Sequence, residues 1–92
     1  MLNITDVRIR KLSPEGKLKA IASVTLSNVF VVHDIKVVEG QKGLFVAMPS
    51  RKTSEGHYRD IAHPITSDFR QLISQVVLDA YQQAMVEEQV SA

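Results

Sequence analysis

The stretch Leu18-Lys-Ala-Ile-Ala-Ser-Val-Thr-Leu26 decides the fold, because apolar residues occupy every second position along it. A period of two is typical of a β-strand with one buried face. The apolar set shares one face, which comprises Leu18, Ala20, Ala22, Val24 and Leu26. The opposite face comprises Lys17, Lys19, Ile21, Ser23 and Thr25. The stretch therefore predicts a strand in a sheet that is covered on one side.

The segments on either side of this strand also have strand character. Residues 4–11 alternate between apolar and polar, and the turn sequence Ser13-Pro-Glu-Gly16 follows them, so the first two strands should form an antiparallel hairpin. After a second turn at Ser27-Asn28, residues 29–38 are rich in β-branched side chains. The dipeptide His33-Asp34 interrupts that run, and the sequence leaves open either a β-bulge or a single helical turn.

Shorter elements are expected further along the chain. Residues 44–48 predict a short buried strand that ends at Pro49. Residues 50–56 are polar and predict a loop, whereas residues 57–62 predict a last short edge strand.

A long helix is expected after Pro64. Thr66 or Ser67 can cap its N-terminus, and apolar residues then recur at the i, i+3, i+4, i+7 spacing of one wide stripe. The stripe comprises Phe69, Leu72, Ile73, Val76, Val77, Ala80, Tyr81, Ala84 and Met85. The prediction is an α+β fold in one domain, 1–92, with an antiparallel sheet (about 3–62) packed against one long C-terminal helix (about 67–88).

Composition excludes several classes of protein. The chain of 92 residues has no cysteine, which excludes disulfide frameworks, thiol catalysis and cysteine-ligated zinc or iron–sulfur sites. No apolar run approaches the roughly 20 residues that span a membrane. We therefore expect a cytoplasmic protein without membrane contacts. Because so short a chain buries little surface, a homodimer is also expected.

The charge is unevenly distributed along the chain. Residues 1–52 contain nine Lys and Arg against four Asp and Glu, a net charge of +5, whereas residues 53–92 carry −4. Such asymmetry indicates either a face that binds a polyanion or a solvated sheet beside an acidic helix. Both interpretations stay open at this point.

The histidines predict neither a metal site nor catalysis. His57, Asp60 and His63 are spaced i, i+3, i+6, and in an extended strand Asp60 would point away from both histidines. His33 and Asp34 are neighbours in a strand, so they cannot orient each other as two members of a catalytic triad. Phosphate-binding glycine loops are absent too. We expect a protein that is not an enzyme and has no cofactor, metal or small-molecule substrate.

The segment Ser50-Arg51-Lys52-Thr53 is the most informative polar patch. Adjacent Arg and Lys beside two hydroxyls are suited to phosphate contacts, with Arg able to bind in bidentate fashion. Aromatic residues are few and mostly occupy expected core positions, so no platform for stacking bases is evident. The helix exposes mainly uncharged polar residues, which makes it a poor reader of the DNA major groove.

Three segments together resemble a known family. They are Val32-His-Asp-Ile35, Gly43-Leu-Phe-Val-Ala-Met-Pro-Ser-Arg-Lys-Thr53 and Arg59-Asp-Ile-Ala-His-Pro-Ile65. Over about residues 2–84 the chain resembles the stage V sporulation protein G (SpoVG) family of bacterial septation and regulatory proteins.

The resemblance implies a sheet packed on a C-terminal helix and a dimer formed partly by strand exchange. It also implies a cytoplasmic regulator that binds DNA or RNA and influences septation, sporulation or related gene expression. The family's basic pair corresponds to Arg51 and Lys52, and the resemblance extends the nucleic-acid-binding set to Arg59 and Arg70. The alternative is a protein-interaction module that regulates cell division or transcription through a protein partner.

Overall fold

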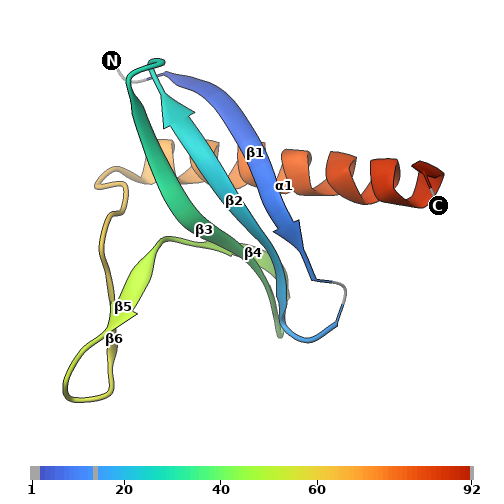
Figure 1. Ribbon diagram of the computed structural model, residues 1–92. Coiled ribbons are helices and arrows are strands. Elements are labelled where there is room, and N and C mark those ends of the chain that lie inside the picture. The colour runs from blue at the N-terminus through green and yellow to red at the C-terminus, as the bar shows by residue number, and fades with distance from the viewer. Residues whose placement is uncertain (1–2, 14, 92) are drawn as a thin grey trace.

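The computed structural model describes residues 3–13 and 15–91, and the side chains within that part up to residue 87. Within these residues the chain forms six strands and one helix (Figure 1). The strands are β1 (Ile4–Leu12), β2 (Leu18–Leu26), β3 (Phe30–Gly40), β4 (Gly43–Ala47), β5 (Ser50–Lys52) and β6 (Tyr58–Asp60), and the helix is α1 (Ser67–Ser91).

Strands β1 to β4 form an antiparallel sheet in the order β1-β2-β3-β4, and α1 lies across one face of it (Figure 1). This confirms the predicted α+β architecture. The predicted alternation in β2 is also confirmed, since Ala20, Ala22, Val24 and Leu26 are buried. Leu18, at the start of the strand, stays 36% exposed. No helix in the described part of the chain is long and apolar enough to cross a membrane.

Helix α1 contributes its predicted stripe to the core. Ile73, Val77 and Tyr81 recur every fourth residue and are buried against the sheet. Thr66 is the N-cap, because its Oγ1 accepts a hydrogen bond from the Phe69 backbone N–H at 3.2 Å. Leu72 of the predicted stripe is 45% exposed, because it borders an open groove between the helix and the sheet.

The structure decides between the two alternatives for His33-Asp34 in favour of a β-bulge. Ala22 pairs with Ile35 and Val24 pairs with Val32, so two residues of β3 oppose Ser23 alone. Asp34 takes the left-handed conformation, with φ of 63°, which Asp tolerates better than most residues. The bulge keeps both Val32 and Ile35 on the side of the sheet that faces α1.

Two predictions for residues 50–62 need correction. Residues 50–56 do not form only a loop, and residues 57–62 do not form an edge strand of the main sheet. Instead β5 and β6 pair antiparallel in a separate two-stranded sheet. Its tip is closed by a hydrogen bond from Thr53 N to His57 O at 2.6 Å, and Ile61 N donates to Pro49 O at 2.7 Å at its base. Polar composition hid this hairpin, because the ladder uses backbone groups that every residue except proline provides.

Removing one methyl group from the core should lower stability measurably. Ile35 is 1% exposed, so Ile35→Val should lower the free energy of unfolding by about 1 kcal/mol. Ile61→Val makes the same change at a residue that is 65% exposed and should stay within about 0.5 kcal/mol of the parent. Urea unfolding followed by circular dichroism measures both, and equal effects would contradict the assigned core.

Candidate nucleic-acid interface

The β5–β6 hairpin projects away from both the main sheet and α1 (Figure 1). It is anchored at its base, because Met48, between β4 and β5, is buried in the core. Beyond that anchor Arg51, Lys52 and all of β6 are exposed. The hairpin therefore presents its side chains to solvent on a short ribbon fixed at one end.

The register of the hairpin brings two predicted site residues together. Arg51 pairs directly with Arg59 across the ribbon. Directly opposed residues in an antiparallel pair point to the same face, with Cβ atoms about 5 Å apart. Lys52 pairs with Tyr58, and alternation along the strand places these two on the other face. Arg51 and Lys52, although adjacent in the sequence, thus lie on opposite faces of the hairpin.

The pairing of Arg51 with Arg59 places two positive charges side by side on one face of the hairpin. Within the described residues neither Arg51 nor Arg59 takes part in an ion pair. Like charges directly opposed across a ladder repel each other, which disfavours the hairpin unless an anion or solvent screens them. A group that accepts hydrogen bonds from both guanidinium groups would relieve that repulsion.

Arg70 lies apart from the hairpin. It is on the first turn of α1, where its Nη2 donates a hydrogen bond to Pro64 O at 3.4 Å. Helix α1 and the hairpin make no contact in the part of the chain that the structure describes. Of the four predicted site residues, the structure brings Arg51 and Arg59 onto one face, leaves Lys52 on the other, and separates Arg70.

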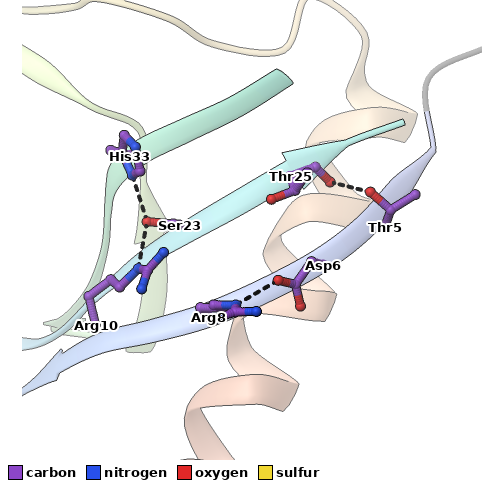
Figure 2. Close-up of polar contacts among 7 residues, drawn as sticks. All are labelled: Thr5, Asp6, Arg8, Arg10, Ser23, Thr25 and His33. Atoms are coloured by element: carbon purple, nitrogen blue, oxygen red, sulfur yellow. Dashed lines mark hydrogen bonds and ion pairs between the residues drawn. The ribbon is translucent and has the colours of Figure 1, made fainter. Parts of the chain in front are cut away.

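A second polar group lies on the face of the sheet turned away from α1 (Figure 2). Ser23 Oγ is 2.9 Å from His33 Nδ1 and accepts a hydrogen bond from Arg10 Nε at 3.3 Å. The Ser23 hydroxyl thus joins a side chain of β1 to a side chain of β3. Ser23 itself is only 4% exposed. Sequence reasoning missed this trio because only the bulge at His33-Asp34 aligns His33 with Ser23.

Two ion pairs engage cations on β1 and β2. Arg8 Nε lies 2.8 Å from Asp6 Oδ2 (Figure 2), and Lys19 Nζ lies 3.3 Å from Glu39 Oε2. The hydrogen bond from Arg8 holds the pKa of Asp6 below its ordinary value and raises the pKa of Arg8. Both Asp6 and Arg8 are exposed, so solvent weakens the pair.

The remaining histidines do not gather around a common point. His63 Nδ1 lies 3.0 Å from Pro64 O, a contact to nearby backbone of the kind expected for a structural histidine. His57 sits at the tip of the hairpin, where its backbone N–H donates to Thr53 Oγ1 at 3.3 Å. Among the described residues no three His, Asp or Glu side chains are placed to share a metal ion.

Comparison with known proteins places the chain in a family. The model of the SpoVG family matches residues 2–83. The chain belongs to the SpoVG family. A protein named "Putative septation protein SpoVG" from Heliobacterium modesticaldum is 69% identical over 84 residues, covering 91% of this chain and 94% of that protein. The protein of the same name from Clostridioides difficile is 59% identical over 91 residues, covering 99% of each chain. These relatives confirm the resemblance seen in the three sequence segments.

The Asp6–Arg8 pair predicts a specific titration behaviour. Because the folded-state pKa of Asp6 is depressed, the pair stabilises the fold above the ordinary value of 3.8, and its contribution is lost as pH falls through the folded pKa. Arg8→Gln should return the pKa of Asp6 toward 3.8, measured by NMR titration of its side-chain carboxyl. Lys42→Gln, in the turn between β3 and β4, is the control. An unchanged Asp6 titration in Arg8→Gln would contradict the pair.

Proposed function

We propose that this SpoVG-family chain is a homodimeric, cytoplasmic regulatory protein that binds DNA or RNA and has no catalytic activity. By the names of its relatives, the process it regulates is septation, with sporulation and related gene expression as further candidates. The observation that carries the proposal is the direct pairing of Arg51 with Arg59 on an exposed hairpin.

The chemistry of this pair fits a phosphodiester. A guanidinium group presents several N–H donors in a rigid fork, and two such forks on one face can bind neighbouring oxygens of one phosphate or two successive phosphates. Phosphate contacts position a protein on nucleic acid without reading its sequence. Lys52 on the other face of the ribbon and Arg70 on α1 then serve as additional, separate contacts.

A second copy of the chain would strengthen such a small site. An apolar groove of about 1150 Å³ lies between the start of α1 and the sheet, and its lining includes Phe30, Ile65 and Leu72. Ile65 is 91% exposed and Phe30 is 62% exposed, and a monomer gains nothing from leaving them in water. We place the dimer partner over this groove. Two hairpins on one dimer then raise affinity by avidity without any new kind of contact.

The second candidate function is a protein-interaction module. The same groove would accept an apolar segment of a partner protein, and the edge strands β1 and β4 offer unpaired backbone groups for an added strand. The oligomeric state and the nucleic-acid affinity of the purified chain distinguish the two candidates.

Replacing the paired arginines tests the nucleic-acid site. Arg51→Ala/Arg59→Ala should weaken binding to labelled DNA or RNA by about tenfold or more, since charge-assisted hydrogen bonds are lost. The slope of log K against log salt concentration should fall by about one for each lost phosphate contact. Fluorescence anisotropy at several salt concentrations measures both quantities.

Lys42→Ala/Lys17→Ala removes the same charge from exposed positions outside the hairpin and serves as the control. Equal affinities and equal salt slopes for the two double variants would contradict the hairpin as the contact site.

The dimer has its own test. Light scattering should give twice the 10.3 kDa mass of the chain. Leu72→Glu places a charge in the groove and should shift the mass to the monomer, because an unpaired charge is costly to bury in an interface. Val86→Glu, on the same helix at a residue that is 53% exposed and outside the groove, should leave the dimer intact. A monomeric parent chain at micromolar concentration would overturn the proposal.

A further inference from the structure

The sheet face opposite α1 carries a group of three cations that a second β-bulge assembles. Ile9 pairs with Ala22 and Lys11 pairs with Ile21, so Arg10 is the extra residue in β1. Arg10 contacts Ser23 on this face, and Lys11 lies opposite Ile21, which alternates with buried Ala20 and Ala22. The bulge thus directs two consecutive basic residues to one face.

The third cation is Lys36, which lies beside Ile21 on the neighbouring strand β3. Lys36 of β3 pairs with Ile21, so Ile21 lies between Lys11 on one neighbouring strand and Lys36 on the other. We call Arg10, Lys11 and Lys36 the Ile21 cluster. Its members form no ion pair within the described part of the chain. Ser23 Oγ holds Nε of Arg10 and thereby fixes the direction in which its guanidinium group points.

The acids near this cluster are mostly engaged elsewhere. Asp6 pairs with Arg8, and Glu39 pairs with Lys19. Asp34, in the β3 bulge beside His33, takes part in no ion pair among the described residues. The face therefore carries more positive than negative charge after its ion pairs are formed, which suits an anionic ligand.

An exposed aromatic ring adjoins the cluster. Leu44 and Val46 of β4 pack against the core, so Phe45 points to the opposite face, where it is 49% exposed. Its ring lies over Gly40, because a Cβ atom at that glycine would come within 3.0 Å of Phe45 Cε1. Phe45 pairs with Val38, two residues along β3 from Lys36. Sequence composition had suggested a core position for this ring, and the structure places it beside the cations instead.

We propose that the sheet face opposite α1, which we call the open face, binds single-stranded nucleic acid. Its phosphates would contact the Ile21 cluster, and one base would stack on Phe45. The inference rests on the proposed function and deepens it by naming the strandedness of the ligand and a second contact surface. An aromatic ring on an open sheet can stack only on a base that is not already stacked within a duplex. Open aromatic and basic sheet faces are suited to unpaired strands for that reason.

The hairpin begins close to the Ile21 cluster along the chain. Lys36 pairs with Ala47 at the end of β4, and β5 begins three residues later at Ser50. Lys11, Ile21, Lys36 and Ala47 thus form one row across the sheet, and the chain continues from the end of that row into the hairpin. A strand that contacts Arg51 and Arg59 can continue onto the face from that end.

The test compares single-stranded and duplex probes at the same salt concentration. The single-stranded probe is a labelled run of about 15 thymidines, and the duplex is the same run annealed to its complement. Phe45→Leu should weaken binding of the single strand by about fivefold or more, since one stacking contact is lost, and should leave duplex binding unchanged. Phe45→Tyr keeps an aromatic ring and should retain the affinity of the parent.

The cluster is tested by the salt dependence. Lys36→Gln should reduce the slope of log K against log salt concentration by about 0.7 for the single strand, the value expected for one lost phosphate contact. Lys42→Gln, in the adjacent turn, should not change the slope. This pair of variants also keeps the proposal testable if Phe45→Leu fails to fold by circular dichroism.

The possible outcomes separate the two proposals. If Arg51→Ala/Arg59→Ala weakens both probes while Phe45→Leu and Lys36→Gln match the parent, the hairpin function stands and the open-face inference is overturned. If the parent does not bind the single-stranded probe, the open-face inference is overturned, while the hairpin proposal is decided by its own measurements on DNA and RNA. If Phe45→Leu instead converts a dimer into a monomer by light scattering, the face belongs to a second copy of the chain, and the inference is overturned as well.

Discussion

The burial of one sheet face beneath α1 is the interaction on which the rest of this molecule depends. Val24 and Val37 from the sheet and Val77 from the helix are fully buried. With no cysteine and only 92 residues, the chain has no cross-link to hold its strands together, so this layer supplies most of the apolar burial. Met48 belongs to the same layer, and through it the core also fixes the base of the β5–β6 hairpin.

Because one face of the sheet is buried in the core, most polar side chains of the strands lie on the other face or beyond the sheet. A strand has a period of two, so the register that buries β2 also directs Ser23 and Ile21 away from the helix. The β-bulges then modify that rule locally. One of them aligns His33 with Ser23, and another directs Arg10 and Lys11 to the same face of the sheet. The β-bulges thus bring the polar side chains of Arg10, Ser23 and His33 together on the open face.

The β5–β6 hairpin is characterised by charge and not by apolar burial. Two arginines directly opposed on a short, exposed ribbon repel each other, and a core-building segment would gain nothing from such a pair. In the function proposed above, a bound phosphate would offset this repulsion. The proposal also accounts for the uneven charge of the sequence, because the cations of the open face and the pair Arg51-Lys52 all belong to its basic half.

The sequence by itself determined the elements whose pattern depends on side-chain polarity. Alternation in Leu18–Leu26 predicted the central strand, and the stripe from Phe69 to Met85 predicted the helix that covers it. Both patterns reflect the removal of apolar side chains from water, which a local sequence records directly. The basic pair Arg51-Lys52 was visible for the same reason, since charge is a property of the residue alone.

Only the tertiary structure decided which residues lie opposite one another. Strand pairing is made by backbone groups that are alike in nearly all residues, so polar Ser50–Lys52 gave no sign that it pairs with Tyr58–Asp60. The same reason hid the partner of Arg51, which is Arg59 across the ribbon and not its neighbour Lys52. One bulge brings His33 to Ser23 and another puts Arg10 and Lys11 on the same face. Both depend on register between distant segments, and register is fixed only when the whole sheet packs against α1.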